Sequence, residues 1–465
     1  MKKVGVVLGC PINVGVGAFL RYYNVLPHLS KCFAQEDISL LVLPQANLLL
    51  WVTKILSSTG FTVDGARSYI VQSMKEASRY CELPMEDVES VLEYACSLSV
   101  GGLNSNPTLN RVLTFGPLSS IHVKDVEGGA LLRYRSLAGL ASDRTAFLYS
   151  TSESLECMWM LDRIGRRVKG ANCGAMLQID AFSSTRTSSS VRNARYFSDL
   201  VLGRPLGSIY ERLIRMGRLR LLLSVSSSPL ISSGMVKMAR EHGCAVGVPS
   251  PANAFDSAID WRNTPTGRGP TAIYFTRLGP SKGLHEIPFI WRGVNRLCPE
   301  AKLKLAGPFQ AQRYRERFFS LVKELGVRNI EYLGYLDRGR LLKELSEAKV
   351  LVYPTHLDSF SLAALEALAS GAALVANGIP AMTSVYSGLP GVSLVEEGDT
   401  ASMAREVARV LRMDDRSFEE MRRDPRLERF LELHSSWENV AKSEYSYLRL
   451  LLPGGAESLK EATVR

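Results

Sequence analysis

Two carboxylates lie where a strand gives way to a helix, a place where such groups can hold a ligand. Asp358 follows the short apolar run Lys349–Tyr353, and Glu366 lies inside the Leu- and Ala-rich stretch Ser361–Ala369. In parallel α/β sheets, ligands bind beyond the carboxyl ends of the strands. A carboxylate in so apolar a helix needs a partner. That partner is either a ligand hydroxyl or a buried arginine or backbone donor of the protein itself.

The start of this helix is a predicted phosphate site. Ser359 is the expected N-cap, and Gly371 is expected to end the helix. The backbone N–H groups of Ser361 and Leu362 would then point outward at the positive end of the helix dipole, which favours an anion. Glu366 would lie ~7.5 Å further along the axis, roughly the distance from a phosphate to a ribose.

Two cations lie in a second loop, Phe275–Gly283, which follows another predicted strand. Arg277 and Lys282 suit a diphosphate, and each charge-assisted hydrogen bond contributes ~1.5–3 kcal/mol. The alternative is a solvated basic loop. Taken with Asp358 and Glu366, the two cations predict one ligand, a nucleotide diphosphate that carries a polar group.

These motifs resemble the retaining GT-B glycosyltransferases of family 4, the glycosyl transferases group 1. The strongest similarity consists of three ordered pieces: Arg277-x4-Lys282-Gly283, Leu333–Leu336, and Asp358-x7-Glu366 with the run to Gly371. A weaker similarity covers Gly15, Gly17, the turn Pro249–Asp256, and Trp437.

The resemblance implies a role for each matching residue. Arg277 and Lys282 would bind the donor diphosphate and form the catalytic set with Asp358, which would approach the transferred sugar. Glu366 would bind the ribose. The other expected binding residues are Ser361, Leu362, Phe360, Gly15, Gly17 and Leu336.

The implied reaction is transfer of a hexosyl-type sugar to an acceptor hydroxyl with retention of configuration. The donor would be a UDP-, GDP- or ADP-linked sugar, and the acceptor a sugar or a lipid-linked molecule. The resemblance implies neither a metal ion nor any other cofactor, because the basic pair and the helix end would stabilise the leaving diphosphate.

Two positions depart from the family pattern. The family usually has Glu where this chain has Asp358, and it often has a His after the strand that matches Gly174–Ile179, where Asp180 stands here. Two alternatives therefore stay open. The first is a catalytically degenerate nucleotide-sugar-binding partner subunit, and the second is another GT-B enzyme such as a sugar-nucleotide epimerase.

The predicted fold class is α/β, with two Rossmann-like domains that face each other across a cleft. The Pro- and Gly-rich segment Pro249–Pro270 is the best domain boundary. A charged helix is expected over Met421–Leu433. We expect an N-terminal acceptor-side domain over 1–255, with a helical excursion at about 46–100, and a donor-side domain over 256–434. A helix over 435–455 should then cross back to the N-terminal domain, and 456–465 should form a tail.

Composition limits the location and the partners. The chain has 465 residues, a net charge of +10, 46% hydrophobic residues and eight cysteines without a CxxC pair. These features predict a cytoplasmic protein with reduced thiols and no membrane span. The arginine-rich stretch Arg192–Arg220 favours either peripheral contact with the anionic inner membrane face or a solvated helix face. No recognition motif accompanies the charge, so no nucleic-acid partner is expected.

Overall fold

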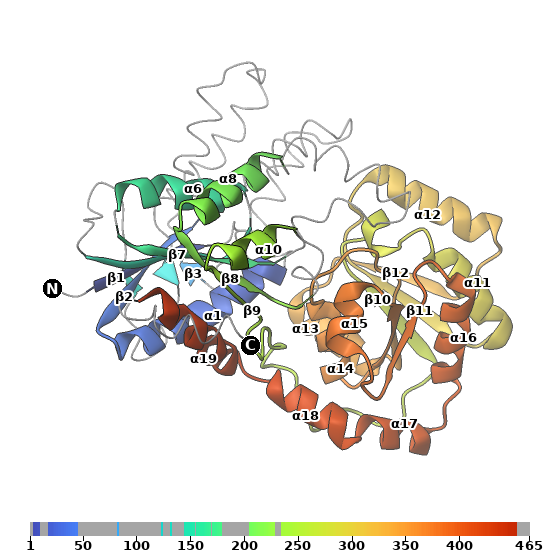
Figure 1. Cartoon of the computed structure of the whole chain (residues 1–465). Coiled ribbons are helices and arrows are strands. Elements are labelled where there is room, and N and C mark those ends of the chain that lie inside the picture. Colours follow the sequence, from blue (N-terminus) through green and yellow to red (C-terminus); the bar gives the residue numbers. More distant parts are fainter. Residues whose placement is uncertain are drawn as a thin grey trace.

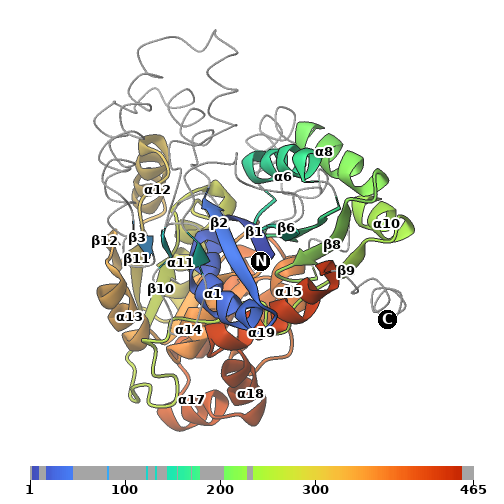
Figure 2. The same cartoon turned by 90° about the vertical axis from the view of Figure 1, so that its left-hand side faces the viewer.

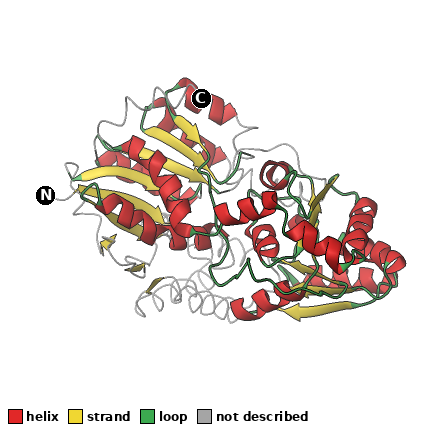
Figure 3. Ribbon diagram, turned by 90° about the horizontal axis from the view of Figure 1, so that it is seen from below, coloured by secondary structure: helices red, strands yellow, loops and turns green. Residues whose placement is uncertain are grey.

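The computed structural model describes residues 3–9, 17–44, 81–82, 122–123, 131–132, 144–153, 155–168, 170–178, 204–227 and 234–452. These residues form two parallel sheets, one from each half of the chain, with helices packed on their faces (Figures 1 and 3). Their strands are nearly continuous apolar runs, as β6 and β14 show by being buried at every position. A parallel sheet covered on both faces requires this pattern.

The N-terminal sheet has the strand order β5-β2-β1-β6-β7-β8-β9, and neighbouring strands run parallel. Its strands are β1 Lys3–Gly9, β2 Ile38–Pro44, β5 Leu131–Leu132, β6 Thr145–Ser150, β7 Asn172–Leu177, β8 Leu219–Ser224 and β9 Ala245–Gly247. Its helices are α1 Gly17–Ala34, α6 Leu155–Arg167, α8 Arg204–Arg215 and α10 Gly234–Glu241.

The C-terminal sheet has the order β12-β11-β10-β13-β14-β15, again with parallel neighbours. Its strands are β10 Thr271–Phe275, β11 Lys302–Ala306, β12 Ile330–Gly334, β13 Val350–Tyr353, β14 Ala373–Asn377 and β15 Val392–Val395. Counted along the chain this is the doubly wound order 3-2-1-4-5-6, whose direction reverses between β10 and β13. Ligands of such sheets bind at that switch point, beyond the carboxyl ends of the strands.

The helices of the C-terminal half alternate with its strands. In chain order they are η3 Pro280–Lys282, α11 Ile287–Leu297, α12 Gln312–Glu324, α13 Arg338–Glu347, α14 Leu362–Ala369, α15 Pro380–Tyr386, α16 Thr400–Leu411, α17 Asp415–Arg422 and α18 Pro425–Leu433. The buried residues of α16 recur at three- and four-residue spacing, so one stripe of this helix faces the core.

The last helix crosses back to the N-terminal sheet, as predicted. After α17 and α18, α19 Trp437–Leu448 lies alongside α1, and η4 Arg449–Leu451 follows it (Figures 1 and 2). Glu444 of α19 accepts hydrogen bonds from Arg21 and Tyr22 of α1, at 2.6 and 3.0 Å, and from Tyr149 of β6 at 2.7 Å. The α/β fold of two Rossmann-like halves is therefore confirmed.

One predicted helix is divided in the structure. Met421–Leu433 is not one helix, because α17 ends at Arg422 and α18 begins at Pro425. Proline has no N–H to donate and disfavours a helical conformation in the residue before it. Asp424 instead caps α18, accepting from the amide of Arg426 at 2.9 Å.

Of the predicted excursion at about 46–100, the structure describes β3 Cys81–Glu82, which pairs antiparallel with β4 His122–Val123. The rest of the excursion, Gly15, Asp180 and the predicted tail 456–465 lie outside the described residues. The domain boundaries stay a prediction, with β9 ending at Gly247 and β10 beginning at Thr271.

Candidate functional site

The predicted site residues of the C-terminal half gather around the carboxyl edge of its sheet. Lys282 ends η3, beyond β10, and Asp358 lies in the loop between β13 and α14. Arg338 begins α13, beyond β12. Lys282 and Asp358 therefore follow the two strands that flank the switch point, the place where doubly wound sheets bind ligands.

Lys282 and Asp358 form an ion pair with each other. The Nζ of Lys282 lies 2.9 Å from Oδ2 of Asp358 and donates to the carbonyl of Leu357 at 2.7 Å. The hydroxyl of Tyr353 donates to the same carboxylate oxygen at 2.7 Å. Burial raises the pKa of Asp358, but the charge and hydrogen bond of Lys282, with the hydrogen bonds of Tyr353 and Ser359, lower it below its ordinary value overall. Asp358 is thus ionised and held in place.

Arg277, the other predicted cation, is exposed and has no ion pair with any residue that the structure describes. It lies two residues beyond β10, in the loop that leads to Lys282. Because its guanidinium carries no structural contact there, it can turn toward an anion at the sheet edge.

Glu366 is paired with an arginine, the second of the two partners that the sequence left open. Arg338 donates to both carboxylate oxygens, from Nη1 at 3.0 Å and from Nη2 at 2.5 Å, and its Nε donates to Asp256 at 2.6 Å. Burial lowers the pKa of Arg338, but the two carboxylates raise it above its ordinary value overall. Each oxygen of Glu366 has a second lone pair, so the pairing leaves acceptor capacity for a ligand hydroxyl.

The N-cap of α14 is Ser361, so the prediction of Ser359 as the cap is wrong. The Oγ of Ser361 accepts from the amide of Ala364 at 3.2 Å. Ser361 has φ 67° and ψ 87°, a left-handed conformation that non-glycine residues rarely adopt. Tyr386 holds the strained residue by donating to its carbonyl at 2.8 Å. The left-handed turn delays the helix until Leu362.

The start of α14 also meets the N-terminal half. The Oγ of Ser226 donates to the carbonyl of Ser359. A Cβ at Gly17, the first residue of α1, would lie 3.2 Å from Cδ1 of Leu362. Among the described residues, the amides of Leu362 and Ala363 have no acceptor. N–H groups without an acceptor in the described part are therefore present at the start of α14, and Leu362 is one of the predicted pair.

Two of the predicted binding residues have buried side chains. Phe360 is 6% exposed, and its ring lies 6.0 Å from that of Tyr386 and 5.5 Å from that of His434. Leu336 is 7% exposed, whereas its neighbour Tyr335 is 50% exposed. The buried side chains of Phe360 and Leu336 therefore pack beneath the surface of the loops at the carboxyl edge of the sheet.

Sequence reasoning missed two residues at this edge, Arg338 and His356. A signal existed for Arg338, because it is the first residue of α13 and a cation is unfavourable at a helix N-terminus. Such an arginine needs a nearby carboxylate. His356, between β13 and Asp358, is 3% exposed and faces two carboxylates.

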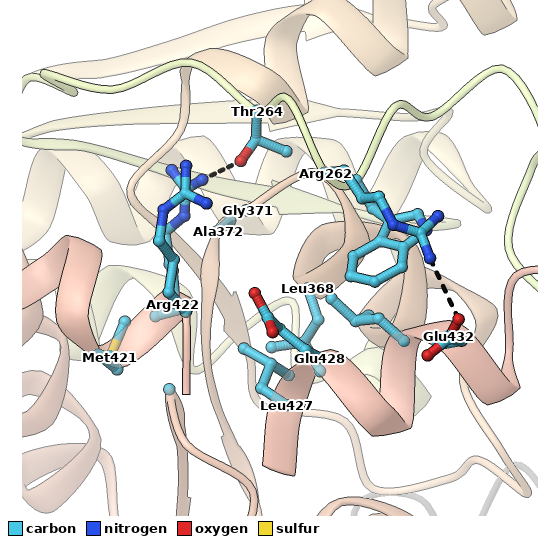
Figure 4. Close-up of a pocket in the computed structure, with 15 residues that line it drawn as sticks. Arg262, Thr264, Leu368, Gly371, Ala372, Met421, Arg422, Leu427, Glu428 and Glu432 are labelled. Carbon is cyan, nitrogen blue, oxygen red and sulfur yellow. Dashed lines mark hydrogen bonds and ion pairs between the residues drawn. The ribbon is translucent and has the colours of Figure 1, made fainter. Parts of the chain in front are cut away.

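A pocket of about 350 Å³ lies at the opposite, amino edge of the same sheet (Figure 4). Its charged groups are largely engaged with the protein. Arg422 donates to Oγ1 of Thr264, and Arg262 to Glu432 at 3.2 Å. None of the predicted site residues lines it. The pocket is therefore a seam between the segment that precedes β10 and the helices α17 and α18.

The described part of the arginine-rich stretch is packed against the N-terminal half. Ile209, Leu213 and Ile214 of α8 are buried, which leaves them unable to enter a membrane. Arg212 pairs with Asp162, and Arg215 with Glu211 at 2.9 Å. Residues 192–203 lie outside the described part.

Neither a metal centre nor a membrane span is found in the parts of the chain that the structure describes. No group of three or more His, Cys, Asp or Glu side chains there could hold a metal ion. The helices there are too short or too polar to cross a bilayer.

Sequence comparison relates the C-terminal half to sugar-transferring proteins. Residues 256–426 match the family Glycosyl transferases group 1. A glycogen synthase of Mycobacterium tuberculosis is 33% identical over 140 residues, 30% of this chain and 33% of that protein. An uncharacterized glycosyltransferase of Methanocaldococcus jannaschii is 27% identical over 183 residues, 39% of this chain and 45% of that protein. The chain thus matches a third to under half of the length of these curated relatives.

Solved structures match over nearly the whole chain, at low identity. HepE of Anabaena in complex with UDP and glucose has a TM-score of 0.57 at 11% identity, covering 96% of this chain and 99% of that one. TarM of S. aureus, in complex with Fondaparinux, alpha-GlcNAc-glycerol and UDP, has a TM-score of 0.59 at 11% identity, covering 97% and 99%. The fold is therefore that of the GT-B glycosyltransferases, and within this chain the segment 256–426 carries the match to the glycosyl transferases group 1.

Proposed function

We propose that this protein transfers a sugar from a nucleotide-diphosphate donor to an acceptor hydroxyl, with retention of configuration and without a metal ion. The observation that carries the proposal is the pair Lys282 and Asp358, which follows the two strands at the switch point of the C-terminal sheet, close to the start of α14. The structural neighbours HepE and TarM were solved with UDP, which favours a uridine nucleotide here.

The donor diphosphate would lie between the first loop after β10 and the start of α14. Arg277 and Lys282 supply positive charge, and the free amides of Leu362 and Ala363 supply hydrogen bonds at the positive end of the helix. As the glycosidic bond breaks, negative charge grows on the leaving diphosphate. These groups then stabilise the transition state more than the bound substrate, which is the requirement for catalysis.

Glu366 would accept hydrogen bonds from the ribose, held in place by Arg338 and Asp256. Asp358 would approach the transferred sugar. Its engagement with Lys282 and Tyr353 also favours a second candidate function, a nucleotide-sugar-binding partner subunit without turnover. A metal is not needed in this scheme because the cations and the helix end carry the leaving charge.

The test is a donor screen with UDP-, GDP- and ADP-sugars, followed by a rate assay. Lys282→Ala should lower kcat/KM by ~10²–10³-fold, because it removes a charge that acts on the leaving group. Lys302→Ala is the matched control, since Lys302 is exposed at the amino end of β11, opposite the carboxyl edge of the same sheet. The rate should persist in EDTA, and NMR of the product should show the donor's anomeric configuration.

A full rate in Lys282→Ala would contradict the diphosphate assignment. Tight binding of a nucleotide sugar with neither transfer nor hydrolysis would select the partner-subunit function instead. The acceptor class and peripheral membrane contact through Arg192–Arg220, with a cytoplasmic location, are further parts of the proposal that rest on the sequence.

A further inference from the structure

His356 joins the Asp358 loop to segments that come from other parts of the sheet. Its Nε2 lies 2.5 Å from Oε1 of Glu286, at the start of α11, and its Nδ1 lies 2.6 Å from Oε1 of Glu397, in the loop after β15. Its backbone amide donates to the carbonyl of Ser281 in η3 at 3.0 Å. A single buried residue thus ties three segments to the loop that carries Asp358.

The two ring contacts determine the charge of His356. A neutral imidazole has one N–H and can donate to one carboxylate, while its other nitrogen presents a lone pair. Here both nitrogens face carboxylate oxygens at hydrogen-bond distance, so the ring donates on both sides when it is an imidazolium. The trio then carries a net charge of −1, and it would carry −2 if the ring lost its proton.

The tie is adjacent to the groups that would bind the donor. Ser281 precedes Lys282, and Asp358 lies two residues after His356. A Cβ at Gly283 would lie 2.0 Å from the carbonyl oxygen of Pro354, so the two loops are in direct contact. A shift of the His356 loop would therefore move the ammonium and the carboxylate relative to each other.

We propose that His356, held as an imidazolium between Glu286 and Glu397, is a positioning residue that sets the Lys282–Asp358 pair for nucleotide binding. This inference rests on the proposed function, since it assigns a role in the same site. Loss of the ring proton removes one of the two ties and adds negative charge beside the diphosphate position. Nucleotide affinity should then fall as the pH rises.

The sign follows from the surroundings of the ring. Burial lowers the pKa of His356, but the hydrogen bonds and charges of Glu286 and Glu397 raise it above its ordinary value overall. These two carboxylates are the charged groups that face the ring from the described elements packed against it. The nearby charges of Lys282 and Asp358 neutralise each other. Because the pKa of His356 is raised, the stabilisation that the imidazolium contributes to the folded site is complete below pH ~6.5, the ordinary pKa of histidine. This stabilisation is lost as the pH rises through the pKa of His356 in the folded protein.

The experiment is isothermal titration of UDP, with GDP and ADP alongside, between pH 7 and pH 9. The second phosphate ionisation of the nucleotide, near pH ~6, is then mostly complete, and its remainder would strengthen binding as the pH rises, opposite to the expected trend. Wild-type affinity should fall by about fivefold or more across this range as the charge is lost. His356→Gln should bind more weakly and without pH dependence. Glu397→Gln should move the midpoint to lower pH, and Glu396→Gln, an exposed neighbouring glutamate, should leave it unchanged.

A readout without nucleotide separates positioning from mere support of the fold. The chain has six histidines, so the ring signal of His356 can be assigned by its absence in His356→Gln. Its NMR titration midpoint should fall in Glu397→Gln. A measurable UDP affinity that stays constant from pH 7 to pH 9 would overturn the role of His356 but leave the proposed function standing. Failure of all three nucleotides to bind at any pH would overturn the proposed function, and this inference with it.

Discussion

Two of the arginine–glutamate pairs in the described part of the chain differ in their surroundings. Arg21 of α1 and Glu444 of α19 are 1% and 0% exposed, and Tyr22 and Tyr149 complete the hydrogen bonds of the carboxylate. Arg338 and Glu366 are 24% and 10% exposed, and Arg338 is shared with Asp256. The first pair is sealed in protein, and the second lies at a surface where a ligand could approach.

This difference separates structural from functional use of the same chemistry. A sealed pair cannot exchange partners without local unfolding, because an unpaired buried charge is costly. A pair at an open edge can accept a ligand hydroxyl while its arginine stays bound. Ser361, with its positive φ, caps the helix that carries Glu366 of the open pair. Strained backbone conformations concentrate at binding and catalytic sites.

The largest effect is expected from breaking the sealed pair. Glu444→Ala leaves the charge of Arg21 buried, and Nη1 of that arginine already lacks a partner in the described part of the structure. Unfolding in urea should show a loss of ~3–5 kcal/mol. Lys442→Ala is the control from the same helix, because its ion pair with Glu438 is 61% and 55% exposed and should leave the free energy of unfolding nearly unchanged. Equal losses for the two variants would remove the distinction between sealed and open pairs.

An intermediate effect is expected at the open pair, and mainly on binding. Glu366→Gln keeps the side-chain volume and leaves Arg338 its bond to Asp256. We expect a stability loss of ~1 kcal/mol and at least ~10-fold weaker nucleotide binding, because one charge-assisted hydrogen bond contributes ~1.5–3 kcal/mol. Thermal unfolding and calorimetry measure the two quantities. Glu347→Gln is the control, because Glu347 is 47% exposed and pairs with Lys304. Nucleotide affinity unchanged in Glu366→Gln would assign this pair to structure alone.

The smallest effect is a gain in stability. Ser361→Gly relieves a left-handed backbone strain of ~1 kcal/mol or more and loses an N-cap worth only a few tenths of a kcal/mol relative to glycine. The variant should unfold at a temperature about 1 °C higher. Ser361→Ala keeps the strain and removes the cap oxygen, so it should be less stable than the wild type. A lower unfolding temperature in Ser361→Gly would show that this conformation carries no strain.

Local patterns in the sequence predicted most of the C-terminal half. The apolar run Lys349–Tyr353 forms β13 Val350–Tyr353, and the strand predicted before the loop Phe275–Gly283 is β10 Thr271–Phe275. Here the apolar period agrees with the tertiary fold. The prediction failed at Asp424–Pro425, where a proline divides a charged helical pattern. α15 Pro380–Tyr386 was missed, since its seven residues give too short a periodic pattern.

By itself, the sequence determined that the chain is a doubly wound α/β protein and that Lys282, Asp358 and Glu366 belong to strand-end loops and the helix beyond them. Those conclusions depend on residue period and spacing, which are local. Only the tertiary structure decided the partners: Lys282 with Asp358, Glu366 with Arg338, and His356 with Glu286 and Glu397. These pairs form between residues up to 76 positions apart, and the strand order of the sheet brings them together.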